Sequence, residues 1–586
     1  MHNSTKTETP PDPFCDHSGN GAARTARFRE LTAGAACAGA VFLVLGPVLL
    51  VTYGIYDSAR MAHDFGWTGE SRMMGVIMGG GRFLYAWFAR WGFSATPYLE
   101  DLWMLRLIGV AGLALTAWLM SRHALKAGWT WAGAVCIALA ATLNPGAAVY
   151  GFWSACFPYG AAIAVAFLAG LLWERERTSW RLLSMLLLQA SLLVYQPAGL
   201  YFLAGPLISW FGRTGEPLRP FRTVWSLLGI LTGLILHVFL VRLLLDLMPG
   251  GVHDQAERLI SGGLRDSLGN VAGSVLPRVL SGWGVLIPGL WALLHLVLAA
   301  GGILLFLFHS RGMGDRLGRL LALAVVGAGF IPALISADGY TPFRLLAPAY
   351  ALAGIVVLAG YRQWLAGRRK TQTMALTCVA LALTGFAAYG IQAGIIRPRE
   401  AEASAVVTAL EEMGEGGTPE GVTVIRPEGS HPFTGVRQLA EYGAYETTYP
   451  GFSEVWMALV AAKVYGWEPG GLYPVNQIHW LFYPAETRAV PSFYPLIDLR
   501  RRLQGLPVTD PERQEGRRAV HPHLGECRFY PPNLYHLPGH GLIQQEADRW
   551  FFMTGKGWMQ WLSEPGERPL RARNVRGETE IIPFGE

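Results

Sequence analysis

The chain has 586 residues, of which 52% are hydrophobic and only 15% are charged. Several apolar runs exceed the roughly 18 residues that mark a candidate membrane-spanning helix, which excludes a single soluble domain. A formal net charge of +6 would suggest nucleic-acid binding in a soluble protein. Here arginine and lysine lie largely in short loops between apolar runs, so the charge indicates membrane topology and no nucleic-acid partner.

Eleven segments are predicted to span the membrane, each near the roughly 20 residues that a bilayer requires. They are residues 32–53, 102–121, 128–146, 155–173, 180–195, 197–211, 223–245, 284–308, 318–336, 344–361 and 373–392. The fifth and sixth are short and meet at Tyr195-Gln196-Pro197, which is compatible with a tight hairpin or with one broken helix. The polar residues 1–30 are predicted to form a disordered cytoplasmic tail.

Loops on the side of the N-terminus hold more than twice as many arginines and lysines as the loops on the other side. The positive-inside rule therefore predicts a cytoplasmic N-terminus and an outer C-terminus. Residues 73–93 are also apolar, but counting them as a span would turn the basic loops outward. We therefore expect an interfacial amphipathic helix there, on the outer face.

The composition becomes polar and rich in aromatic residues from residue 397 onward. Residues 400–413 and 453–464 have the pattern of helices and residues 421–426 that of a strand, and the last stretch suggests a small β-rich part. The sequence thus predicts an α-helical polytopic membrane protein followed by an α+β domain outside the cytoplasm. The membrane part covers residues 31–396 with outer loops 54–101 and 246–283, and the outer domain covers residues 397–586.

The first outer loop carries acids and arginines beside the membrane. Asp57 follows the first span, and Arg60 and Asp64 come three and seven residues later, with Glu70 and Arg72 beyond them. Charges at an apolar interface are costly unless they are paired or used. A carboxylate can act as general base on a sugar hydroxyl while an arginine holds a phosphate. The alternative for Asp57 is an ordinary solvated loop residue.

Arg82 and Arg344 are the other candidate phosphate ligands. Arg82 follows three glycines, which permit positive φ angles or a close approach of an anionic headgroup; the alternative is a broken helix with a snorkelling arginine. Arg344 begins a helix after the turn that contains Asp338, and its alternative role is to anchor to headgroups. Tyr195 and Gln196 lie near the outer face, where a glutamine is more often interhelical glue than a ligand contact.

Several common catalytic motifs are absent from the sequence. It has no P-loop, no HExxH, no strand-bound GxGxxG and no metal-type spacing among its six cysteines. An activated sugar donor would then have to be recognised from the membrane. We expect neither a metal nor a cofactor.

The first outer loop resembles a known family. Tyr56-Asp57, Arg60, Trp67, Gly81-Arg82 and Pro97 are similar to the motif residues of the bacterial O-antigen glucosyltransferases of Gtr type, which are polyprenyl-phosphate-sugar-dependent glycosyltransferases of GT-C architecture. Tyr195-Gln196 looks like the Tyr-Gln of that family, whereas Gly80 stands where the family has asparagine.

The resemblance implies a GT-C-like glycosyltransferase of the bacterial inner membrane with a periplasmic C-terminal domain. It would move a sugar such as glucose from a polyprenyl-phosphate carrier to a polysaccharide or lipid-linked glycan acceptor such as O-antigen. Asp57 would be the base, and Arg60, Arg82 and Arg344 would bind the donor phosphate. Supporting or acceptor-side roles would fall to Asp64, Glu70, Arg72, Tyr195, Gln196 and Asp338.

Two other functions stay open at this stage. An O-antigen polymerase or ligase would depend on arginine or histidine in the loop 246–283. A transporter or flippase for lipid-linked glycans would need charged residues at mid-membrane depth, of which the sequence offers few.

Overall fold

A computed structural model gives the structure of the chain. It describes residues 17–53, 57–67, 69, 72–212, 220–247, 264–286, 290–309, 313–335, 341–414, 417–419, 421–426, 453–467, 478–483, 489–491 and 495–504, together with the strands between residues 512 and 582 that are given below.

The membrane part is entirely helical in the described residues. Its longer helices are α1 (His17–Leu45), α5 (Leu102–Lys126), α6 (Trp131–Thr142), α8 (Tyr159–Trp173), α9 (Thr178–Val194), α12 (Pro220–Asp246), α15 (Leu290–Phe308), α16 (Met313–Ala328), α18 (Phe343–Trp364) and α19 (Arg369–Ile391). Shorter pieces connect them: η1 (Gly46–Leu50), α7 (Pro145–Phe152), η3 (Ser154–Cys156), α10 (Gln196–Gly199), η4 (Leu200–Leu203), α11 (Ala204–Gly212), α13 (Leu264–Asn270), η6 (Val271–Val275), α14 (Leu276–Ser281), η7 (Gly282–Leu286) and α17 (Ile331–Leu334).

The chain is an α-helical polytopic membrane protein. Seven helices in the described residues are long and apolar enough to cross a membrane, and an eighth span arises if the bent pair α6 and α7 counts as one. The three remaining predicted spans correspond to shorter apolar helices in α9, in α10 to α11 and in α16 to α17. Each of the eleven predicted segments is therefore helical, and these three fall short of the length that identifies a span by itself.

Small residues let the central helices approach closely. A Cβ on Gly112 of α5 would lie 2.6 Å from the backbone nitrogen of Ala161 in α8, and one on Gly160 would lie 2.6 Å from the carbonyl oxygen of Gly109. Glycine at these positions allows the two backbones to touch, as is common where helices pack inside a membrane.

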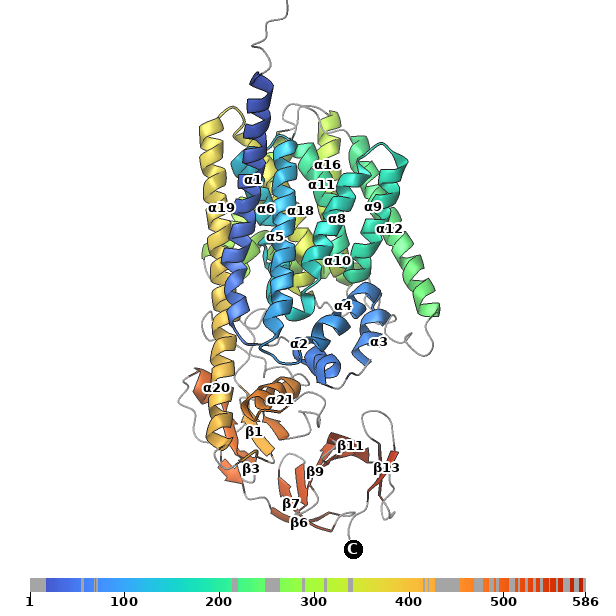
Figure 1. Cartoon of the computed structure of the whole chain (residues 1–586), viewed down its shortest axis with the longest axis vertical. Helices are drawn as coiled ribbons and strands as arrows, with labels where there is room; N and C mark the ends of the chain where they lie inside the picture. The colour runs from blue at the N-terminus through green and yellow to red at the C-terminus, as the bar shows by residue number, and fades with distance from the viewer. Residues whose placement is uncertain are drawn as a thin grey trace, which may run out of the picture.

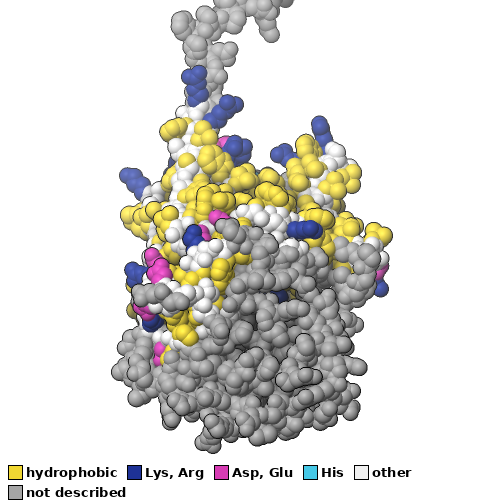
Figure 2. Space-filling view, turned by 60° about the horizontal axis from the view of Figure 1, so that its bottom comes forward, with side chains coloured by type: hydrophobic (Ala, Val, Ile, Leu, Met, Phe, Trp, Pro, Cys, Tyr) yellow, Lys and Arg dark blue, Asp and Glu magenta, His cyan; other side chains and the backbone are white. Residues whose placement is uncertain are grey.

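Figure 1 shows the helices standing side by side, with the N-terminal end of α1 at one end of the bundle. Hydrophobic side chains cover much of the flank, and many Lys and Arg side chains gather toward that same end (Figure 2). One detail of the prediction was wrong: α1 begins at His17, so residues 17–30 of the expected disordered tail are helical.

The first outer loop folds at the opposite end of the bundle (Figure 1). It contains α2 (Asp57–Met61), the π-helical turn η2 (Ala62–Trp67), α3 (Arg72–Gly79) and α4 (Phe83–Ser94). None of these is a candidate span, which confirms that the apolar run at 73–93 does not cross the membrane as one helix. Trp87, Phe88 and Trp91 of α4 are 59%, 43% and 67% exposed, as expected of an interfacial helix.

A single helical rod connects the membrane part to the C-terminal part. It runs over 46 residues, Arg369–Gly414, and comprises α19, the π-helical turn η9 (Gln392–Ile396) and α20 (Arg397–Gly414). The predicted helix at 400–413 lies within α20. Figure 1 shows that the rod extends past the end of the bundle at which the first outer loop lies and that α20 ends beside α21.

The C-terminal part mixes helices and sheets. α21 (Ser453–Val464) and β1 (Gly421–Ile425) confirm the predicted helix and strand, and α23 (Leu499–Gln504) follows later. β1 lies between β2 (His479–Tyr483) and β4 (Leu496–Asp498) in a parallel sheet, and β3 (Ala489–Pro491) pairs with β5 (Glu512–Gln514). The last part is an eight-stranded antiparallel sheet in sequence order: β6 (Arg517–His521), β7 (Gly525–Tyr530), β8 (Leu534–Leu537), β9 (Gly541–Glu546), β10 (Arg549–Thr554), β11 (Gly557–Trp561), β12 (Leu570–Arg573) and β13 (Thr579–Ile582).

Candidate functional site

A cavity of about 110 Å³ lies between the first outer loop and the ends of the bundle helices. Its lining combines methionine, aliphatic and aromatic side chains with two arginines. The lining residues are Met61, Met73, Val76, Ile77, Arg82, Tyr85, Trp153, Ala155, Cys156, Tyr159 and Arg344. Among these lining residues the charged side chains are Arg82 and Arg344. The structure thus brings together two of the three arginines that the sequence analysis selected as phosphate ligands.

Arg82 stands in the break between α3 and α4, directly before the first residue of α4. Its Nη1 lies 3.5 Å from the hydroxyl of Tyr159, to which it donates, and its Cζ lies 5.7 Å from the ring centre of Tyr85. Burial by itself would lower the pKa of Arg82, but the hydroxyl groups of Tyr159 and Tyr85 outweigh it and raise that pKa overall. The guanidinium therefore keeps its positive charge at the cavity wall.

Arg344 reaches the same cavity from the first turn of α18. Its Cζ lies 4.5 Å from the ring centre of Trp153, a cation–π distance. Its carbonyl oxygen accepts a hydrogen bond of 2.7 Å from the hydroxyl of Tyr150. The end of α7 thus orients both the backbone and the side chain of Arg344.

Four tyrosines pack behind the two arginines. The rings of Tyr159 and Tyr195 stack at 4.0 Å with an interplanar angle of 4°, and Tyr85 and Tyr150 meet the Tyr159 ring edge to face at 5.2 and 5.5 Å. The sequence analysis missed Tyr85, Tyr150, Trp153 and Tyr159. The available signal was the dense run of aromatic residues at 150–159 in an otherwise alanine-rich apolar stretch, at the junction of the predicted spans 128–146 and 155–173.

Helix α2 is attached to the wall of this cavity. The Ser58 hydroxyl accepts a hydrogen bond of 3.0 Å from the backbone nitrogen of Ala155, and Met61 lines the cavity. Asp57 is the first residue of α2 and directly precedes Ser58. Its side chain lies outside the described residues, so its catalytic role stays a prediction.

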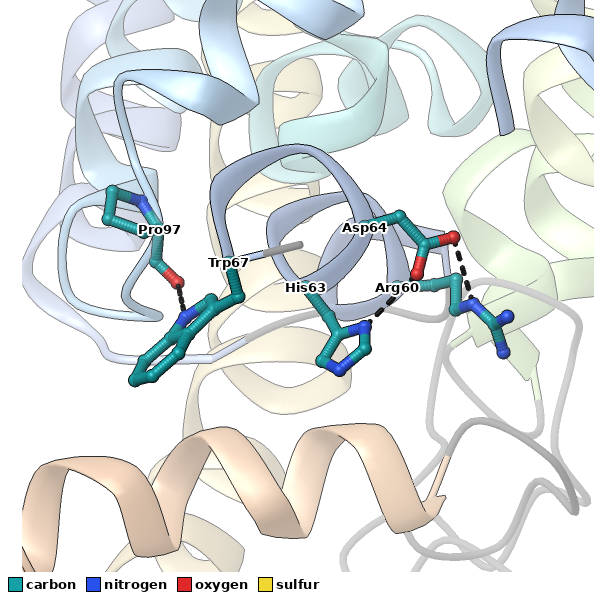
Figure 3. A network of polar contacts seen from close by, with 5 residues as sticks. All are labelled: Arg60, His63, Asp64, Trp67 and Pro97. Carbon is teal, nitrogen blue, oxygen red and sulfur yellow. Dashed lines mark hydrogen bonds and ion pairs between the residues drawn. The ribbon is translucent and has the colours of Figure 1, made fainter. Parts of the chain in front are cut away.

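Arg60 and Asp64 form a separate network, drawn in Figure 3. Arg60 Nε donates to one oxygen of Asp64 at 3.1 Å and His63 Nδ1 to the other at 3.0 Å. The Asp64 carboxylate is 2% exposed. Burial raises the pKa of Asp64, but the hydrogen bond from His63 and the positive charge of Arg60 outweigh it and hold that pKa below its usual range. Asp64 is therefore an ionised acceptor with both oxygens engaged.

This network places Arg60 differently from the prediction. Its guanidinium contacts Asp64 and is not among the groups that line the cavity, so its role toward a donor phosphate stays a prediction. His63 was overlooked in the sequence, where its position directly before Asp64 was the signal. Trp67 Nε1 donates to the carbonyl oxygen of Pro97 at 2.9 Å, so two residues of the family-like motif close the loop on itself.

Gln196 lies next to the break that carries Arg82. Its Nε2 donates to the carbonyl oxygen of Gly80 at 2.8 Å, so the Tyr-Gln and Gly-Arg motifs meet in space. Of the other predicted site residues, Glu70, Asp338 and the side chain of Arg72 lie outside the described residues.

The charged residues at the start of α5 make contacts away from the cavity. Asp101 is the N-cap residue of α5, but its side chain makes no capping hydrogen bond. Glu100 pairs with Lys463 of α21 at 3.5 Å. Arg106 donates to the carbonyl oxygens of Val51 and Tyr53.

The residues that the structure describes contain no cluster of three or more His, Cys, Asp or Glu side chains able to hold a metal ion.

No protein-family model matches the chain, and no curated protein matches its sequence. Among solved structures, the chain is similar to the crystal structure of ArnT from Cupriavidus metallidurans bound to undecaprenyl phosphate. The identity is 13% over 73% of this chain and 84% of that chain, with a TM-score of 0.34. The function proposed below rests on the residues of this chain.

Proposed function

We propose that the protein is a GT-C-type membrane glycosyltransferase that takes a sugar from a polyprenyl-phosphate carrier and transfers it to a cell-surface glycan. The observation that carries this proposal is the pair Arg82 and Arg344 on one apolar and aromatic cavity. The transfer would take place at the outer face of the bacterial inner membrane, with an acceptor such as O-antigen.

The cavity suits a phosphate group. Two guanidinium groups on one apolar wall repel each other and lose hydration, and an anion between them removes both costs. Arginine is the side chain best matched to phosphate because its planar donor groups can bind two oxygens at once. Trp153 faces the guanidinium of Arg344, and the Tyr159 hydroxyl accepts from that of Arg82, so uncharged aromatic groups line the proposed phosphate site.

The position of the cavity favours a phosphate carried by a lipid. Arg82 directly precedes α4, and α4 exposes Trp87 and Trp91, residues that commonly lie at the level of lipid headgroups. A phosphate bound by Arg82 would then lie at headgroup level, while its polyprenyl chain stays among the lipids. The first outer loop would thus serve as the donor side of the site.

The reaction follows from these placements. The acceptor hydroxyl attacks the anomeric carbon of the donor sugar, and the bond from that carbon to the phosphate oxygen breaks. The electron pair leaves with the carrier phosphate, whose growing negative charge Arg82 and Arg344 would stabilise. The hydroxyl proton passes to the general base, for which we propose Asp57. We propose no metal and no cofactor for this step.

Asp64 fits a structural role better than a catalytic one, because Arg60 and His63 already occupy both of its oxygens. The described arginines inside the bundle are also used structurally. Arg106 and Arg362 bond to backbone carbonyl oxygens of neighbouring segments, and such contacts favour a transferase over a transporter.

The test is transfer of labelled sugar from a polyprenyl-phosphate donor by the protein in liposomes. We expect Arg82→Ala and Arg344→Ala each to lower kcat/KM by roughly 100-fold or more, since each removes a charge that faces the leaving phosphate. Arg90→Ala is the matched control, because Arg90 is an exposed arginine of α4 that is not among the cavity-lining residues. Wild-type rates in both cavity variants would refute the proposed function.

A further inference from the structure

The hydrogen bond from Gln196 to the carbonyl oxygen of Gly80, here called the tie, joins two parts of the chain that lie 116 residues apart. Gln196 starts α10, and Gly80 lies in the break between α3 and α4. A buried amide between helices is usually only a packing contact. This one ends two residues before the arginine that faces the cavity, so its effect on that arginine can be followed step by step.

The backbone between the tie and Arg82 has little freedom. Gly81 has φ +74°, a left-handed conformation that other residues adopt at a cost. A Cβ at this position would lie 3.1 Å from Gln196 Nε2 and 3.3 Å from the side chain of Val241. The amide of Gln196 therefore fixes the carbonyl of Gly80 and also packs against Gly81, and together these contacts set the direction in which Arg82 leaves the break.

Tyr195, the residue before Gln196, acts on the side chain of Arg82 through Tyr159. The ring of Tyr195 stacks on Tyr159 at 4.0 Å, and the Tyr159 hydroxyl accepts the hydrogen bond from the Arg82 guanidinium. Gln196 thus holds the backbone that precedes Arg82, and Tyr195 packs against Tyr159, the aromatic partner of the Arg82 side chain.

We propose that Gln196, assisted by Tyr195, is a positioning residue for Arg82 and makes no contact with the donor itself. This inference rests on the proposed function and deepens it, since it assigns the Tyr-Gln pair to the donor-phosphate site. It makes specific the supporting role that the resemblance implied for Gln196, and it differs from interhelical glue and from ligand contact. Loss of the tie would let the break relax and move the guanidinium away from the phosphate.

A double-mutant cycle tests this inference. Gln196→Met keeps the size of the side chain and removes the donor, and we expect it to raise the donor KM by about tenfold, the usual effect of one lost hydrogen bond. In an Arg82→Ala background the same change should add nothing, because Gln196 acts through Arg82. Additive effects would overturn the inference.

Gln189→Met is the matched control. Gln189 is a buried glutamine of the neighbouring helix α9. Its Nε2 donates to the carbonyl oxygen of Gly233 at 2.7 Å, and neither residue lines the cavity. We expect this variant to leave the donor KM unchanged. An equal rise in both variants would show a general packing effect and contradict the inference.

A second variant covers the case in which Gln196→Met does not fold. In Gln196→Glu the protonated carboxyl group can donate to Gly80, whereas the ionised group repels that carbonyl oxygen. The donor KM of Gln196→Glu should therefore rise with pH more steeply than that of the wild type. A pH profile parallel to the wild type would overturn the inference.

Hydrogen exchange separates the inference from the proposed function. Amide exchange at residues 79–82 should be faster in Gln196→Met than in the wild type and in Gln189→Met, with no substrate present. If exchange rises in Gln196→Met but Arg82→Ala leaves kcat/KM unchanged, the positioning holds and the proposed function fails. If Arg82→Ala lowers kcat/KM while Gln196→Met changes neither the donor KM nor the amide exchange at residues 79–82, only the positioning role fails.

Discussion

At the scale of single residues, the sequence distinguished charges more reliably than aromatic groups. Arg82 and Arg344 were selected because an arginine at an apolar boundary needs a purpose, and both line one cavity. Tyr85 and Tyr159 gave no such signal, because an aromatic residue in an apolar run is also ordinary packing. Arg60 met the same criterion as Arg82. It pairs instead with Asp64, one helical turn further along the chain, and does not line the cavity.

The two aspartates of the first outer loop are expected to respond differently to loss of charge. Asp57→Asn should lower kcat by roughly 10² to 10⁴ and leave the donor KM unchanged, because it removes the proposed base. Asp64→Asn should leave kcat nearly unchanged and destabilise the loop by about 1–3 kcal/mol, because one charged acceptor serves two donors. Transfer kinetics and thermal inactivation measure the two effects, and an unchanged kcat in Asp57→Asn would contradict the mechanism.

The destabilisation in Asp64→Asn has a defined pH dependence. The folded pKa of Asp64 is depressed, so the stability that its charge adds is fully present above the ordinary aspartate range. That stability is lost as the pH falls below this range. The wild type and Asp64→Asn should therefore differ most near neutral pH and converge in acid.

At the scale of elements, hydropathy located the helices but not their breaks. The predicted spans at 128–146 and 155–173 meet in a region where α7, η3 and α8 succeed one another, and the residues of this break line the cavity. The pattern of apolar residues does not reveal such a break, because the helices on both sides of it are equally hydrophobic. The triple glycine before Arg82 did mark the break between α3 and α4, since positive φ is a local requirement.

The exposed aromatic residues of α4 lead to a prediction at this scale. Leu84, Trp87, Phe88 and Trp91 are exposed at helical spacing and would hold α4 at the membrane surface. We expect Trp87→Ser with Trp91→Ser to lower kcat/KM for a donor in liposomes by roughly tenfold or more, since burial of one large apolar side chain contributes over 1.4 kcal/mol. The control is Trp131→Ser with Trp180→Ser, which removes two tryptophans exposed elsewhere on the bundle; equal losses in both pairs would contradict a specific role for α4.

At the scale of the whole molecule, the C-terminal part lies against the first outer loop. Tyr98 donates to the carbonyl oxygen of Trp467 at 3.2 Å across 369 residues, and Lys463 pairs with Glu100. The rod of α19 and α20 connects the bundle to this C-terminal part (Figure 1). The charge pattern predicted that both lie on one side of the membrane. Their contact was not predictable, because pairings over such sequence separations leave no periodic signal.

The most direct test of the account is the position of the carrier phosphate. A cryo-electron microscopy structure of the full chain in a lipid nanodisc with a polyprenyl phosphate should show the phosphate between Arg82 and Arg344, within hydrogen-bonding distance of both guanidinium groups. The polyprenyl chain should leave the cavity into the lipid. A phosphate bound elsewhere on the protein, with the cavity between Arg82 and Arg344 empty, would contradict the account.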